Sequence, residues 1–503
     1  MELDTSLRKV FCCGVSEEKK AVVPVDCSIV LPDYFPDVMK ILRYTAKTVK
    51  SPVFSEGGAE VVSGSVNIEV NYVSEEGELC SCSQLQPFSH SFEIGKNVSA
   101  AEAEISVGEM GCRAVNKRRI DLHGSIEILL RVLCGEEKNV LSSVSGAGAV
   151  FKKEETETVL MVGEFFKNFT VDEKGELGYG KPPFGRVIRS SAMGEVTECH
   201  MIQDKIVTKG EIRVNVLWSA EANPENSESG IFLSSFSFPV SRMVDAEGIL
   251  LTDICDARYE AEFPEIIPSE DGSCIGIKVK VGIFARVYRK EKTEFISDMF
   301  STEFETKPEK TKLLVINEAL PISVSEQIFE KFDLPEGIED VTDIWVETKN
   351  PKVSGEGKIE LCSKLCMFAK DGEGAPLYFE KEIEKEIKSP AEGKNIVFHN
   401  LFSGIRSEDF SFGRDGKAEI SAAVIIDGTV YSGSSTEAVA LCSIKSEKKI
   451  EQDSAAMIFC YAEKGEEIWD IAKKYGAAME KIMEENGLNE ERLNEKRMLV
   501  ITR

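Results

Sequence analysis

The sequence predicts a mainly β protein, in which three tandem β-sandwich or barrel-like repeats precede a small C-terminal module of the order strand–helix–helix–strand. Three observations predict this fold. Short segments along most of the chain alternate apolar and polar residues with a period of two, which is typical of half-buried strands. Related proline-containing segments begin at residues 31, 182 and 334, and their near-equal spacing indicates internal repetition. After residue 457 the apolar spacing becomes that of amphipathic helices.

The length and the net charge of the chain indicate several domains and argue against nucleic-acid binding. A chain of 503 residues is too long for one hydrophobic core, and its 42% hydrophobic residues are enough for several. The 87 acidic residues outnumber the 60 basic residues, which gives a formal net charge of −27. Phosphate backbones and anionic membranes repel such a chain, so we expect no nucleic-acid partner.

The first 21 residues contain no apolar run of signal-peptide length, and no later segment offers about 20 uncharged apolar residues in a row. We therefore expect a cytoplasmic protein without a direct membrane span. The 14 cysteines are scattered, and in a chain without an export signal they are expected to be free thiols and not a disulfide framework.

The first predicted repeat covers residues 1–150. Pro32 and Pro36 fix an extended segment at 31–38, through which no helix runs. Residues 38–49 then show helix-like apolar spacing and predict one or two helical turns. An alternating strand follows from Gly64 to Tyr72, and a second alternating run covers residues 120–130.

The second and third predicted repeats cover residues 151–308 and 309–445. Each repeats the order of the first, with a glycine before an alternating strand and a second alternating run near its end. These strands are expected at 210–218, 275–283, 357–365 and 418–424. The alternative is that any β protein alternates in this way and that the spacing of the repeats is coincidental. A polar linker is expected at 446–456.

The C-terminal module covers residues 457–503. Two short strands at its ends enclose two amphipathic helical stretches, of which the first ends at Gly476, a residue type that commonly terminates helices. Trp469 is predicted to be the main core residue of this module, whose core is too small to tolerate truncation of a large side chain.

Residues 461–476, together with Ile482, 486–488 and 499–501, resemble a LysM domain. Members of this family commonly bind polymers of N-acetylglucosamine, such as peptidoglycan, in a groove formed by the loops after the first strand and the second helix. Gly465-Glu466-Glu467 stands where the family usually has Gly-Asp-Thr, which removes a hydroxyl and adds negative charge. The candidate groove or partner-binding residues that follow from this resemblance are Gly465, Glu466, Glu467, Trp469, Asn486, Gly487 and Leu488. The alternative role of Gly465 and Asn486 is to form turns and caps.

The proline-containing segment, the glycine-led strand and the threefold spacing are similar to the SPOCS domain of clostridial sporulation proteins, and the resemblance is best over residues 31–132. Three such units followed by one LysM module resemble the SipL family. This resemblance implies action in the mother cell, at the forespore surface. It implies binding of the coat-morphogenetic ATPase, stage IV sporulation protein A, through the C-terminal module, which helps to tether the spore coat; other coat proteins are further candidate partners.

No short motif in the sequence predicts catalysis, a cofactor or a metal site. Cys199-His200 and the pair Cys362 and Cys366 lack the paired four-ligand spacing of zinc sites, and ordinary packing explains buried thiols. Together with the domain order and the missing export signal, the resemblance therefore implies a non-enzymatic scaffold. The alternative function is that of a glycan-binding LysM protein of the cell wall or spore cortex.

Overall fold

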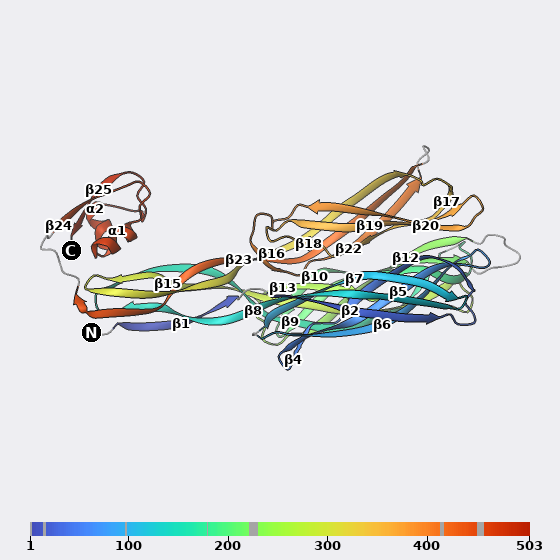
Figure 1. Cartoon of the computed structure of the whole chain (residues 1–503), viewed down its shortest axis with the longest axis horizontal. Coiled ribbons are helices and arrows are strands. Elements are labelled where there is room, and N and C mark those ends of the chain that lie inside the picture. The colour runs from blue at the N-terminus through green and yellow to red at the C-terminus, as the bar shows by residue number, and fades with distance from the viewer. Residues whose placement is uncertain are drawn as a thin grey trace.

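The computed structural model describes residues 3–13, 17–95, 98–178, 180–220, 230–412, 417–449 and 457–502. The molecule is an elongated rod in three regions (Figure 1). A broad head of β-sandwiches continues into a narrower stalk of long strands, and a compact module with two short helices lies at the end of the stalk farthest from the head. The predicted fold class, mainly β with a small C-terminal α/β module, is confirmed.

Head and stalk are built from three units, which we call unit 1 (residues 3–145), unit 2 (149–301) and unit 3 (304–449). The strands of unit 1 are β1 (Asp4–Cys13), β2 (Glu17–Val30), β3 (Val38–Lys50), β4 (Phe54–Glu56), β5 (Ala59–Ser74), β6 (Leu79–Glu93), β7 (Val98–Asn116) and β8 (Arg119–Ser145). Those of unit 2 are β9 (Ala149–Glu176), β10 (Phe184–Ile202), β11 (Lys205–Ala220), β12 (Ile231–Asp245), β13 (Ile254–Ala261), β14 (Glu265–Pro268) and β15 (Cys274–Ser301). Those of unit 3 are β16 (Phe304–Asp333), β17 (Ile338–Thr348), β18 (Lys352–Val353), β19 (Ile359–Asp371), β20 (Pro376–Ile387), β21 (Ile396–His399), β22 (Phe402–Phe412) and β23 (Lys417–Lys449).

Each unit has two antiparallel sheets that enclose a hydrophobic core of its own. In one sheet the long last strand of the unit, β8, β15 or β23, is central and pairs with the first long strand of the same unit. In the other sheet β5, β11 or β19 is central and pairs with the strands that precede and follow it. The predicted alternating strands supply these central positions, because alternate residues of a strand point to opposite faces and one face lies on the core.

The three units share irregularities of strand pairing as well as strand order. Near their starts, β3, β10 and β17 share two register shifts against their partners, at Val38/Lys40 and Ile41/Arg43 in unit 1 and at the corresponding positions in the other units; β10 has a third shift at Val196/Glu198. The predicted helical turns at residues 38–49 are therefore wrong, since this segment is β3. Each bulge adds one residue to the strand, so the residues of β3 that pack on the core, Val38, Ile41 and Ala46, do not follow a period of two.

The first and last long strands of each unit continue beyond the sandwich as a two-stranded ribbon. Ribbon 1 pairs residues 4–13 with 135–145, ribbon 2 pairs 149–161 with 288–301, and ribbon 3 pairs 304–316 with 433–449. Side chains from all three ribbons form shared apolar clusters, one of which contains Val10, Val140, Phe295, Leu313 and Ala438. The ribbons thus form the stalk (Figure 1).

The stalk also locates the predicted domain boundaries. The boundary expected between residues 308 and 309 falls inside β16, because the paired strands of ribbon 3 begin at Phe304. Of the linker expected at 446–456, residues 446–449 belong to β23, and residues 450–456 lie outside the described part of the chain.

In the head, the units meet through buried charges. Arg43, Arg189 and Asp343 occupy corresponding positions, each directly after the second bulge of its strand. The Arg189 guanidinium donates to Asp343 Oδ2 at 2.7 Å, and the two side chains are 7% and 1% exposed. Arg43 donates to Glu347 of unit 3 at 2.5 Å. Ion pairs of two buried arginines therefore join unit 3 to both other units.

Candidate functional site

The C-terminal module consists of β24 (Met457–Ala462), α1 (Ile468–Tyr475), α2 (Met479–Asn486) and β25 (Arg497–Thr502), with β24 and β25 paired antiparallel. The buried face of α1 carries Ile468, Trp469, Ile471 and Ala472 at helical spacing. Both helices end at a glycine in the left-handed conformation, Gly476 with φ 63° and Gly487 with φ 58°, where other residues are strained. The predicted strand–helix–helix–strand order is therefore present.

The first predicted loop, Gly465 to Glu467, lies between β24 and α1. Gly465 and Glu466 are exposed, and Gly465 has φ 92°, which requires glycine. Backbone hydrogen bonds tie this loop to residues 491–493, through Gly465 N–H to Leu493 O and Leu493 N–H to Glu466 O.

The second predicted loop follows α2. Asn486 is buried, and its side-chain amide donates to Ile482 O and Val500 O while its Oδ1 accepts from Val500 N–H. These bonds hold α2 against β25 and leave Asn486 few atoms for a ligand. Gly487 is exposed and Leu488 packs against the module core. No hydrogen bond among the described residues joins this loop to the first.

Trp469 is 4% exposed and connects the module to the stalk. Its indole Nε1–H donates to Asp298 Oδ2 of β15 at 2.9 Å, and its ring centroid lies 5.2 Å from that of Phe300 in an edge-to-face arrangement. Phe300 belongs to unit 2, yet it is part of the hydrophobic cluster of the module. The sequence predicts Trp469 as a core residue, but it does not reveal the two stalk residues, because a contact so distant along the chain leaves no local pattern.

Two ion pairs accompany this aromatic contact. Lys473 Nζ contacts both oxygens of Asp298, at 2.9 and 2.7 Å, and Lys152 Nζ lies 3.0 Å from Glu467 Oε2. Burial alone would raise the pKa of Asp298, but the hydrogen bonds from Lys473 and Trp469 hold it below its ordinary value. The hydrogen bond and charge of Lys152 lower the pKa of Glu467, with a smaller contribution from Arg492. Both carboxylates are therefore charged partners at neutral pH.

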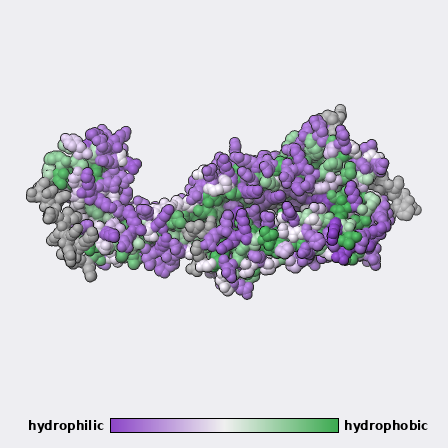
Figure 2. Space-filling model, viewed as in Figure 1, coloured by the Kyte–Doolittle hydropathy of each residue, from purple (hydrophilic) through white to green (hydrophobic). Residues whose placement is uncertain are grey.

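The outer face of the β24–β25 sheet is apolar and exposed. Met457, Phe459 and Tyr461 alternate along β24, and Met498 pairs with Tyr461 across the sheet; these four side chains are 49%, 58%, 73% and 45% exposed. Hydrophobic surface is visible on the module in Figure 2. Large exposed apolar side chains that cluster on one face are typical of protein-interaction surfaces. This face was not predicted from the sequence, although the alternation along β24 is readable there.

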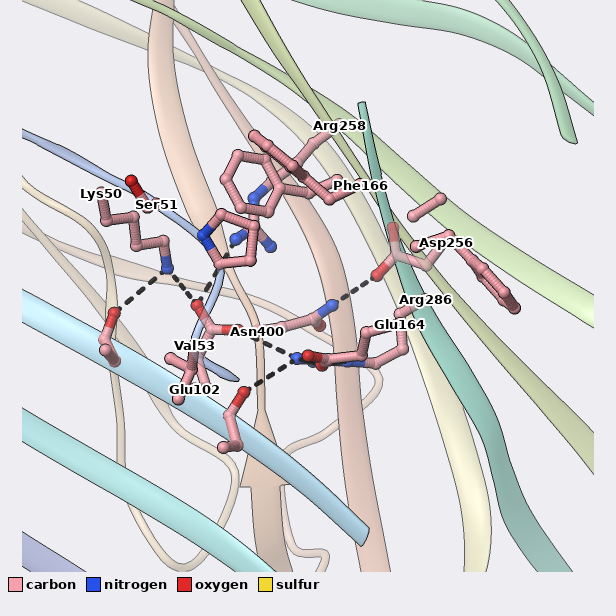
Figure 3. A pocket seen from close by; sticks show the side chains of 16 residues that line it. Lys50, Ser51, Val53, Glu102, Glu164, Phe166, Asp256, Arg258, Arg286 and Asn400 are labelled. Carbon is pink, nitrogen blue, oxygen red and sulfur yellow. Dashed lines mark hydrogen bonds and ion pairs between the residues drawn. The ribbon is translucent and has the colours of Figure 1, made fainter. Parts of the chain in front are cut away.

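A second candidate is a chamber of about 100 Å³ where the three units meet in the head (Figure 3). Glu102 of unit 1 accepts from Lys50 and from Arg258 and Arg286 of unit 2, and Arg286 Nη1 has no hydrogen-bond partner among the described residues. These cations keep the pKa of Glu102 low, although burial alone would raise it. The three cations are balanced by three lining carboxylates, those of Glu102, Glu164 and Asp256. The ion pairs that line the chamber therefore connect unit 1 to unit 2, and the lining side chains present no net charge to a ligand.

Within the described residues, no group of three or more histidine, cysteine, aspartate or glutamate side chains could hold a metal ion. Neither described helix has the length or the apolar run that crossing a bilayer requires.

Two parts of the chain match known families. Residues 184–266 match the family described as SipL, SPOCS domain, and residues 463–502 match the LysM domain family. The SPOCS match falls on unit 2, whereas we expected the best resemblance at residues 31–132. Both are families of non-catalytic binding domains. No match was found among curated proteins or among solved structures.

Proposed function

Because this chain combines a SipL-type SPOCS domain with a C-terminal LysM domain, we propose that it is a non-enzymatic sporulation scaffold. Its LysM module binds the coat-morphogenetic ATPase, stage IV sporulation protein A, and thereby helps to tether the spore coat to the forespore surface in the mother cell. The observation that carries the proposal is the occurrence of both domains in this order in one chain.

Two features of the module support a protein ligand over a glycan. The outer sheet face exposes Phe459 and Tyr461, which suit a protein surface that buries aromatic side chains. In the loops that form the groove in the LysM family, Asn486 uses its amide within the module and Glu466 adds a negative charge. The internally bonded amide and the added negative charge do not favour a neutral sugar polymer in these loops.

A pull-down with purified ATPase tests the proposal. The full chain should capture the ATPase, and a chain that ends at residue 449 should not, since it retains the three unit cores and lacks the module together with residues 450–456. Equal capture by the shortened chain would contradict the assignment of binding to the module.

The second candidate function is binding of peptidoglycan or another N-acetylglucosamine polymer, which the LysM match itself favours. Sedimentation with insoluble peptidoglycan separates the two. Strong pelleting of the full chain at physiological salt, together with failure to capture the ATPase, would replace the first function by the second.

A further inference from the structure

The three ribbons of the stalk are alike in backbone and differ in side chains where the module meets them. Each ribbon has a register shift near its tip, which leaves Ser142, Ser297 or Ala440 without a partner in the opposite strand. The first residue after this bulge is Ser143 in ribbon 1, Asp298 in ribbon 2 and Leu441 in ribbon 3. The bulge therefore gives three comparable positions, of which one carries an acid.

The two neighbouring positions differ in the same way. Two residues further along, ribbon 2 has Phe300, where ribbons 1 and 3 have Ser145 and Ser443. Across the ribbon from Asp298 lies Lys152, where ribbon 1 has Ser6 and ribbon 3 has Glu309. The other ribbons thus lack the aromatic ring, and a glutamate at the Lys152 position would repel Glu467.

Each of the three residues on ribbon 2 meets a matching group of the module. Asp298 accepts from Trp469 Nε1 and from Lys473 Nζ, Phe300 packs against the Trp469 ring, and Lys152 pairs with Glu467. An acid opposite a lysine, a ring opposite a ring and a lysine opposite an acid are complementary in charge and shape. The module is therefore fitted to one ribbon out of three.

We propose that the tip of ribbon 2, formed by Lys152, Asp298 and Phe300, is an internal docking site for helix α1 of the LysM module. Docking covers Trp469 and engages the ammonium of the half-exposed Lys473, so a partner can bind both side chains only after the module is released. The outer β24–β25 face lies on the other side of the module fold and stays exposed in the docked state. While the module is docked, a partner can therefore contact the outer β24–β25 face but not the face of α1 that carries Trp469.

Lysine labelling of the full chain tests the docking. Lys473 and the adjacent Lys474 are treated with an amine-reactive acylating reagent, and their modification is compared by mass spectrometry. An ammonium held by two carboxylate oxygens reacts slowly, so Lys473 should be modified severalfold less than Lys474. The substitution Asp298→Lys should remove this difference, because it replaces the acceptor by a like charge.

The control is Glu294→Gln, at an exposed carboxylate of the same strand whose ion pair within the described part of the chain is with Lys153 at 3.9 Å. This variant should keep the labelling ratio of the unchanged protein. Equal labelling of the two lysines in the unchanged protein, or a ratio that Asp298→Lys leaves unaltered, would overturn the proposal. Acrylamide quenching provides a second reading, since Trp218 and Trp345 are 0% and 1% exposed and added quenching in Asp298→Lys would come from Trp469.

The consequence for partner binding rests on the proposed function. If the ATPase uses the Trp469–Lys473 face, Asp298→Lys should raise its apparent affinity for the full chain by about tenfold or more, the equivalent of one lost hydrogen bond to a charged group. Failure of the ATPase to bind either protein would count against the proposed function alone, because the labelling ratio decides on docking without a partner.

Discussion

The head junction and the module contact both rely on charged pairs, but they differ in burial. At the head junction the Arg189 and Asp343 side chains are 7% and 1% exposed. At the tip of ribbon 2, Asp298 is 14% and Lys473 is 40% exposed. Removing one partner of a fully buried pair leaves an uncompensated charge, whereas water can replace a partner at a half-exposed pair. The difference indicates a head that stays assembled and a module that can be released.

The largest expected effect is at the head junction. Asp343→Ala leaves the Arg189 guanidinium buried without its nearest acceptor, and removal of one partner from a buried pair typically costs about 3–5 kcal/mol. Urea unfolding of the full chain should show this loss in the transition of the head. A change as small as that of a surface pair would contradict the description of the junction as fixed.

The second-largest expected effect is a loss of stability of the head at acidic pH. Burial lowers the pKa of His399 to about 4, and Arg131 contributes in the same direction. Between pH 6.5 and 4 the folded state therefore binds fewer protons than the unfolded state. The free energy of unfolding is unaffected by His399 above pH 6.5, the pKa of the unfolded state, and it decreases as the pH is lowered from 6.5 to 4. The loss for a group this buried is on the order of 3 kcal/mol at pH 4.

Thermal unfolding measured at several pH values checks this prediction, with His399→Gln as the comparison. The variant should show a flatter pH dependence between pH 6.5 and 4, because glutamine does not titrate. An unchanged slope would show that other groups cause the acid sensitivity.

A smaller effect is expected at the module contact. Trp469→Phe keeps a ring against Phe300 but removes the N–H bond to Asp298, and a hydrogen bond to a charged group contributes about 1.5–3 kcal/mol. Calorimetry should show a lower transition temperature for the module and an unchanged transition for the head. Tyr461→Phe, at an exposed ring of the same module, is the control and should leave both transitions in place.

The smallest effect is expected at an exposed pair of the head. Lys381 and Glu330 are 2.7 Å apart, with side chains 53% and 27% exposed, and such pairs contribute at most about 1 kcal/mol. Lys381→Met should therefore barely move the urea midpoint. If Lys381→Met lowered the free energy of unfolding as much as Asp343→Ala, buried and exposed ion pairs would contribute equally to the stability of the head.

The sequence predicted what local patterns encode. The strand around Val66 to Tyr72 and the helix around Trp469 were found because their apolar spacing matches one structure. Residues 38–49 were assigned to a helix because two bulges break the period of two in β3. Bulges depend on the partner strand and leave no such period in the sequence.

Contacts between segments that are distant along the chain could not be predicted either, because they also depend on the fold and not on a local pattern. Asp298 and Phe300 lie in a strand whose own alternation is unremarkable, and only the fold brings them to Trp469. The stalk was missed because its ribbons continue the strands of the sandwiches, so nothing in the spacing marks where a sandwich ends. The two predicted LysM loops, in contrast, carry glycines whose positive φ explains their place in the sequence.

The central claim is that the C-terminal module binds a protein and not a glycan. The most direct test is a solution titration of the full chain with purified stage IV sporulation protein A, in the absence and presence of an excess of an N-acetylglucosamine oligomer. We expect saturable binding of the ATPase with an affinity that the sugar leaves unchanged. Binding of the oligomer to the chain with displacement of the ATPase, or binding of the oligomer alone, would contradict the account.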